Sequence, residues 1–279
     1  MTTAVASRPI RWFWLRPVVA AGTLGVLVWS VGTSPFLDGL RSVDGGALAA
    51  AFGLAVLTTV CCAWRWTIVA RGLGIELTLG TAVAAYYRSL FLNVTLPGGV
   101  VGDVHRGVRH GLRAVIWERT AGQVVQIVLT VAVLLVLPSP VQATMPLVAL
   151  VVAAAGVALA MRVRLFAWRA WPAITLLSAL VVAGHAVTFL IAARAAGATA
   201  PLSTIVPLAL LVLAAGALPN VGGWGPREGV TAWAFAAAGL GASRGVATAV
   251  VYGVMVFVAS LPGAAVLVAS WVRGGVAHV

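Results

Sequence analysis

Long stretches without charged residues constrain this chain more than any other feature. Reaching about 30 Å across a hydrocarbon layer takes about 20 helical residues. Alanine, leucine and valine dominate the stretches, and no polar alternation with a period of two appears, which favours helices over a transmembrane barrel. The sequence therefore predicts an all-α, polytopic membrane protein with about six full spans, at 18–33, 47–63, 120–137, 145–161, 173–193 and 246–272.

The composition argues against a separate soluble domain. Of 279 residues, 62% are hydrophobic and 9% are charged, whereas a soluble domain carries about 25% charged residues. We therefore expect residues 1–279 to form a single membrane domain. The 18 cations are all arginines, which with abundant alanine, valine and glycine suggests a GC-rich bacterial gene and a bacterial plasma membrane.

Arginine distribution predicts the orientation of the chain. Arginines cluster before 18–33 and within 65–78, 103–119 and 162–170, whereas the loop at 138–144 has no charge. The positive-inside rule places the arginine-rich segments and both termini in the cytoplasm. This loop bias accounts for the net charge of +12 without nucleic-acid binding, so we expect no nucleic-acid partner.

Two proline–glycine breaks interrupt apolar segments. The segment 79–102 is broken at Leu-Pro-Gly-Gly from residue 96, and 203–241 is broken at 218–226. Proline removes a backbone donor and glycine favours non-helical backbone, so we predict two re-entrant hairpins. The chain then divides into halves of similar element order, about 15–138 and 144–273, as in an inverted repeat with a midplane site. The alternative is two ordinary loops and eight full spans.

Scarce polar residues gather at the first break. They are Asn93, Asp103, Arg106, Glu118 and Arg119. Arginines bind phosphate well, and charges at membrane depth are costly unless paired. They are interpreted as substrate-binding residues, with the carboxylates orienting arginines or meeting a cationic headgroup. The alternative is a solvated cytoplasmic loop followed by a helix N-terminus.

A second group, Asn220, Arg227 and Glu228, follows the second break. Arg227 could bind a lipid phosphate, or the charged pair could neutralise itself and fix the hairpin. We predict that both groups line one cavity. His185, in the middle of an apolar run, is either a packing residue or a proton relay.

Nothing in the sequence indicates catalysis or a cofactor. Cys61 and Cys62 lie together in an apolar run with no histidine nearby, so no disulfide framework or metal site is expected. No phosphate loop or nucleophile–base arrangement is present. We therefore expect no enzyme activity, no cofactor and no metal ligands.

The broken segments carry a family resemblance. The pattern N-x-x-LPGG-x-x-GD-x-x-R at 93–106, the ER-x-x-G stretch at 118–122 and the GGWG-x-RE stretch at 222–228 resemble the transmembrane region of the lysylphosphatidylglycerol synthase and flippase family. Trp64-Arg65-Trp66 is similar to an earlier element of that family. The chain departs from the pattern at Val101, where glycine is common, and at Pro226.

The resemblance implies a lipid translocase without a soluble transferase domain. Its substrate would be a phosphate-bearing lipid, such as aminoacylated phosphatidylglycerol or a polyprenyl-linked glycolipid. A separately encoded synthase or glycosyltransferase is a possible partner. Two alternatives stay open: a non-transporting scaffold for such an enzyme, and a secondary transporter of a soluble solute.

Overall fold

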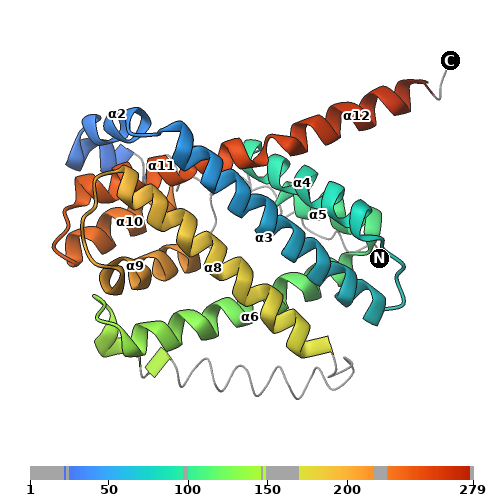
Figure 1. The fold of residues 1–279 in the computed structure, drawn as a ribbon, viewed down its shortest axis with the longest axis horizontal. Coiled ribbons are helices and arrows are strands. Elements are labelled where there is room, and N and C mark those ends of the chain that lie inside the picture. Colours follow the sequence, from blue (N-terminus) through green and yellow to red (C-terminus); the bar gives the residue numbers. More distant parts are fainter. Residues whose placement is uncertain are drawn as a thin grey trace, which may run out of the picture.

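A computed structural model describes residues 22, 25–96, 100–145, 147–148, 170–216 and 225–276 of the chain (Figure 1). Within these residues every regular element is a helix, which confirms the all-α prediction. The short helical elements are residues 25–31, α2 (Ser34–Arg41) and the 3₁₀ turn η1 (Gln142–Thr144). The rest of the described chain is built from longer helices.

Four helical stretches are long and apolar enough to cross a membrane. Three are α3 (Gly45–Gly72), α6 (Leu112–Val136) and α8 (Trp171–Ala195). The fourth runs through α11 (Ala242–Ser260) into α12 (Pro262–Val276). In each, more than half of the most apolar window is not buried within the protein, which leaves apolar side chains to face lipid. These helices indicate a multi-pass membrane protein.

These four stretches correspond to four of the six predicted spans. The predicted spans at 18–33 and 145–161 lie partly or mostly outside the described residues. Helix α3 is longer than its predicted span, because it continues past residue 63 to Gly72. Arg65 falls in the segment 65–78 that we predict to be cytoplasmic, and its side chain is buried within the helix bundle; the side of the membrane on which it lies stays a prediction.

The two predicted breaks separate pairs of short helices. Helix α4 (Leu79–Thr95) ends where Leu96 takes an extended conformation, as expected for a residue before proline, and α5 (Val101–His110) follows. Helices α9 (Leu202–Ala215) and α10 (Pro226–Ala237) flank the second break. Each pair packs together. Pro97 and Pro219 lie outside the described residues, and the membrane depth of the breaks stays a prediction.

The two halves of the chain pack in one pattern. Helix α3 packs on α4 and α6, and α8 packs correspondingly on α9 and α11. Between the halves, contacts of α6 with α8 and α9 match contacts of α11 with α3 and α4, while α3 and α8 pack on each other. Figure 1 shows α3 and α8 crossing the molecule side by side. This pairing supports the repeat hypothesis, although the inverted orientation stays a prediction.

Candidate functional site

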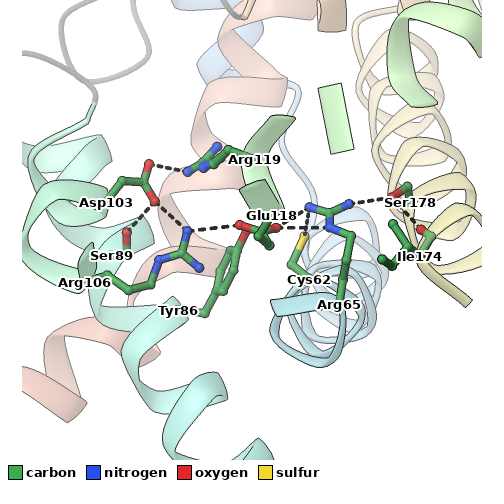
Figure 2. A network of polar contacts seen from close by, with 10 residues as sticks. All are labelled: Cys62, Arg65, Tyr86, Ser89, Asp103, Arg106, Glu118, Arg119, Ile174 and Ser178. Carbon is green, nitrogen blue, oxygen red and sulfur yellow. Dashed lines mark hydrogen bonds and ion pairs between the residues drawn. The ribbon is translucent and has the colours of Figure 1, made fainter. Parts of the chain in front are cut away.

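The carboxylate of Glu118 on α6 lies at the centre of a network of charged side chains (Figure 2). We call this group the buried charge network; it consists of Arg65, Asp103, Arg106, Glu118 and Arg119. Its Oε1 accepts hydrogen bonds from the Arg65 guanidinium, with Nε at 3.1 Å, and from the Tyr86 hydroxyl at 3.1 Å. Its Oε2 accepts from Nη2 of Arg106 at 3.2 Å. Glu118 is fully buried and so joins α3, α4 and α5 to α6.

Asp103 on α5 forms the second node. Its Oδ1 accepts from the Ser89 hydroxyl at 3.1 Å and from Nη2 of Arg106 at 3.0 Å. Its Oδ2 accepts from the Asn93 amide at 3.0 Å and from the Arg119 guanidinium. One guanidinium nitrogen of Arg106 therefore bridges the two carboxylates.

Asn93 clamps the two helices of the first break together. Besides donating to Asp103, its amide oxygen accepts the backbone N–H of Gly102 at 2.8 Å. That N–H belongs to the first turn of α5 and has no partner within the helix. A Cβ atom on Gly102 would lie 2.1 Å from the Ser89 carbonyl oxygen, so glycine is required there. The asparagine and the Gly-Asp pair of the motif thus have one structural explanation.

Aromatic rings surround the Arg106 guanidinium. Its central carbon lies 4.1 Å from the Tyr86 ring centroid and 4.5 Å from that of Trp66. Cation–π attraction offsets part of the cost of burying this fully buried cation. Nε and Nη1 of Arg106, and Nε of Arg119, are buried without a hydrogen-bond partner among the described residues.

The network carries more positive than negative charge. Three arginines face two carboxylates, Asp103 and Glu118, which leaves a surplus of one positive charge. The side chain of Arg119 is 41% exposed, against 1% for Arg106. An anion at the surface of the protein could therefore contact Arg119 and add the missing negative charge.

The alternative of a solvated cytoplasmic loop is wrong for Arg106 and Glu118, because both lie on helices and are fully buried. The structure brings together all five site residues predicted at the first break. Sequence reasoning missed three further members: Arg65, Tyr86 and Ser178, whose hydroxyl accepts from Nη1 of Arg65 at 2.8 Å. The Trp64-Arg65-Trp66 element was a signal for Arg65. Nothing singled out Ser178 within its apolar run.

Glycine at 122 explains the spacing of the ER-x-x-G stretch. It lies one helical turn after Glu118 on α6. A Cβ atom there would lie 2.8 Å from both terminal nitrogens of Arg65. Those nitrogens are held by Glu118 and Ser178, so they cannot move away without losing partners. Gly122 therefore makes room for the guanidinium.

The second group forms a compact pair at the start of α10. Nε and Nη2 of Arg227 donate to Oε1 of Glu228 at 3.0 and 2.7 Å. Oε2 of Glu228 accepts the backbone N–H of Gly225 at 2.6 Å, which caps the helix. Gly225 has φ of +107°, a conformation that favours glycine. Asn220 lies outside the described residues.

Arg227 also faces a cavity inside the bundle. Two adjoining cavities of about 200 and 190 Å³ share His185, Leu213, Gly216 and Tyr252. We call them together the polar cavity, because Gln123, Gln126 and Arg227 interrupt a lining that is otherwise mostly apolar. The Arg227 guanidinium carbon lies 5.4 Å from the Tyr252 ring centroid, and the Tyr252 hydroxyl lies 3.4 Å from Nδ1 of His185.

An apolar cavity lies on the other side of His185. Small and aliphatic side chains of α3, α4 and α11 line most of it, together with Cys62 and Tyr86. His185 borders both the apolar and the polar cavity and lies within hydrogen-bond distance of Tyr252, which leaves open whether it is a packing residue or a proton relay. Tyr86 contacts Glu118 and also borders the apolar cavity, whereas the described cavity lined by Arg227 is not lined by Glu118 or Asp103.

Comparison with known protein families gives a match over more than half of the chain. Residues 13–171 match the family model described as the lysylphosphatidylglycerol synthase TM region. The match includes the whole charge network. No curated protein matches the chain.

Proposed function

Because this chain belongs to the lysylphosphatidylglycerol synthase TM region family, we propose that it is a flippase-like translocase of a phosphate-bearing lipid. The family and the apolar helices make it a membrane protein. Translocation means that the headgroup passes through the protein while the hydrocarbon tails stay in the bilayer. The chain does this without a catalytic step, a cofactor or a metal.

The observation that carries the proposal is the positive surplus of the buried charge network. An uncompensated charge inside a membrane protein is costly, and such charges mark substrate pathways. Buried donors of Arg106 and Arg119 lack partners among the described residues. Guanidinium groups bind phosphate in a bidentate manner, so a lipid phosphate at the exposed side of Arg119 supplies the missing negative charge.

The cavities suggest where the remainder of the lipid passes. The polar cavity lies among α6, α8, α9 and α11, close to the second break. In the proposal, the two breaks form re-entrant hairpins around this path, related by an inverted repeat. The sequence contains no ATP-binding motif, so the movement is downhill or is driven by an ion gradient.

The proposed setting follows from the arginine distribution. The protein lies in a bacterial plasma membrane with both termini in the cytoplasm, where the arginine-rich segments face the cell interior. Its partners are a membrane phospholipid or glycolipid and a separately encoded synthase or glycosyltransferase. In this setting the network at the first break takes lipid from the cytoplasmic leaflet.

Substitution of Arg119 tests the proposal. Purified protein is reconstituted into vesicles, and the movement of a fluorescent phosphatidylglycerol between leaflets is measured. Arg119→Gln removes the most accessible phosphate donor, while Asp103 keeps Arg106, Ser89 and Asn93. We expect the translocation rate to fall about tenfold or more, as loss of a charge-assisted contact implies.

The matched control is Arg113→Gln on the exposed face of the same helix, which removes the same charge and should leave the rate unchanged. Equal rates for wild type and Arg119→Gln would contradict phosphate binding at the network. If wild-type vesicles move no lipid above protein-free vesicles, the translocase proposal fails and the scaffold alternative is favoured.

A further inference from the structure

One arginine of α4 is nearly buried without a partner of opposite charge. Arg88 is only 8% exposed, and its Nε is buried with no hydrogen-bond partner among the described residues. None of the ion pairs between described residues includes it. Taking a guanidinium out of water without a compensating anion is costly. An anion that reaches the exposed part of this guanidinium would lower that cost.

The side chains around Arg88 are basic. Arg109 on α5 lies close enough to Arg88 for the two like charges to interact, and both guanidiniums act on the imidazoles of His105 and His110. Burial and these two charges lower the pKa of both histidines, so each imidazole is mainly neutral at pH 7 and still donates one N–H. The ring of His110 lies edge-on to Trp66, with centroids 5.8 Å apart. We call Arg88, His105 and Arg109 the α4–α5 basic site.

The acidic side chains of the chain do not neutralise the α4–α5 basic site. All six lie among the described residues. Asp103, Glu118 and Glu228 pair with the arginines of the buried charge network and with Arg227. The other three make no ion pair with a described residue; they are Asp38, Asp44 and Glu76. The charges of Arg88 and Arg109 are therefore left for an anion from outside the chain, and basic pockets at the cytoplasmic side of a membrane bind anionic headgroups.

Exposed apolar side chains beside the site indicate that the anion belongs to a lipid. Val104 and Val108 on α5 are 54% and 78% exposed. They are four residues apart, so they lie on one face of the helix, and His105 and Arg109 each follow one of them in the sequence. A free phosphate gains nothing from such a surface, whereas the hydrocarbon chain of a phospholipid covers it.

We propose that the α4–α5 basic site holds the phosphate of an anionic phospholipid, with one acyl chain lying along Val104 and Val108. This lipid is not the one that we propose to be moved, whose phosphate binds at Arg119. The site goes beyond the proposed function, because a lipid held here would hold α4 and α5 at the membrane surface in a translocase and in a scaffold alike.

Native mass spectrometry tests the proposal by counting retained lipids. Detergent-purified protein is titrated with phosphatidylglycerol in the presence of an equal amount of zwitterionic phosphatidylcholine. Wild type should retain two phosphatidylglycerol molecules, and Arg88→Gln should bind one of them about tenfold more weakly, as loss of a charge-assisted contact implies. Arg71→Gln removes the same charge at an exposed position in the last turn of α3 and should bind both as wild type does. Unchanged binding in Arg88→Gln would overturn the proposal.

Two further variants separate this site from the charge network. Arg109→Gln changes an exposed side chain, so the fold should be kept, and it should weaken the same lipid at least threefold. Arg119→Gln should weaken the other lipid. If Arg119→Gln binds both lipids as wild type does, phosphate binding at the network fails and the α4–α5 basic site stands. If only Arg119→Gln loses a lipid, the reverse holds.

Glycerol 3-phosphate distinguishes a lipid from a free phosphate, because it carries a phosphate group without acyl chains. Added at the same concentration as phosphatidylglycerol, it should leave both lipids bound. Displacement of the lipid that depends on Arg88 would show that the phosphate alone is recognised and would overturn the assignment of the site to a phospholipid.

Discussion

Glu118 is the residue that joins the other members of the buried charge network. It is fully buried, and its two oxygens hold Arg65, Arg106 and Tyr86. Arg65 also donates a hydrogen bond to the Ser178 hydroxyl on α8, so the network extends to that helix. A buried ion pair need not stabilise a protein relative to apolar residues, but removing one partner leaves the others uncompensated. Loss of this one carboxylate would therefore affect five helices.

Replacement of Glu118 by glutamine should destabilise the protein by about 3–5 kcal/mol, the cost of breaking a buried pair. The shape is kept, but one acceptor oxygen becomes an NH2 donor that faces other donors, so the loss reflects both the charge and a lost acceptor. Thermal unfolding of the detergent-purified variant would measure it. Glu76→Gln, at an exposed position, removes the same charge and should stay within about 0.5 kcal/mol of wild type; an equal loss in both variants would contradict the role of Glu118.

Residue types and spacing predicted most of the charged members of this network but not their uncharged partners. Asp103, Arg106, Glu118 and Arg119 stand out because charges are scarce in the sequence. The partners Tyr86 and Ser178 have no such signal, because tyrosines and serines are tolerated throughout membrane helices. Charge counting used Arg65 only to orient the chain, so it gave no sign that this side chain is buried against Glu118.

At the scale of elements, the break between α4 and α5 is built as a clamp. Asn93 and Ser89 on α4 bind Asp103 and the Gly102 N–H on α5. The sequence predicted this break because proline and glycine interrupt an apolar run. The sequence could not predict how closely the two helices pack. The close packing depends on Gly102, which has no Cβ atom and therefore lies directly against the Ser89 backbone.

Gly102→Ala should force α4 and α5 apart. The added Cβ would lie 2.1 Å from a backbone oxygen, which no rotamer change can relieve, so we expect a loss of about 1–3 kcal/mol. Thermal unfolding measures this loss. Gly53→Ala on α3 has nothing within 4 Å and should be neutral or gain up to about 1 kcal/mol from helix propensity. If Gly102→Ala has wild-type stability, α4 and α5 can move apart without a loss of free energy, and close packing at Gly102 is not required.

At the scale of the whole molecule, several helix contacts of one half recur in the other, whereas those of α2 with α11 and of α12 with α4 have no counterpart among the described residues. The sequence predicted the order from its two breaks. It could not predict which helices of one half pack on the other, because apolar faces of alanine, leucine and valine are alike in composition. The crossing of α3 and α8 instead depends on a local fit, where Gly184 lies against Thr58.

Orientation can be tested at the two ends of α3. In a background with Cys61 and Cys62 replaced by alanine, Ser42→Cys and Glu76→Cys place single thiols just beyond the helix ends. A membrane-impermeant thiol reagent added to intact cells should label Ser42→Cys and leave Glu76→Cys unlabelled until the cells are opened. The reverse pattern would overturn the predicted orientation, and labelling of both in intact cells would show that α3 does not span.

The distance along the chain between Arg65 and Glu118 has a consequence for biosynthesis. The pair is separated by 53 residues, and a ribosome adds about 5–20 residues per second. Arg65 therefore emerges roughly 3–10 s before its partner exists. During that interval α3 carries an unpaired cation, whose placement in hydrocarbon is costly. The nascent helix must wait in the insertion machinery, or at the lipid surface, until α6 arrives to complete the pair.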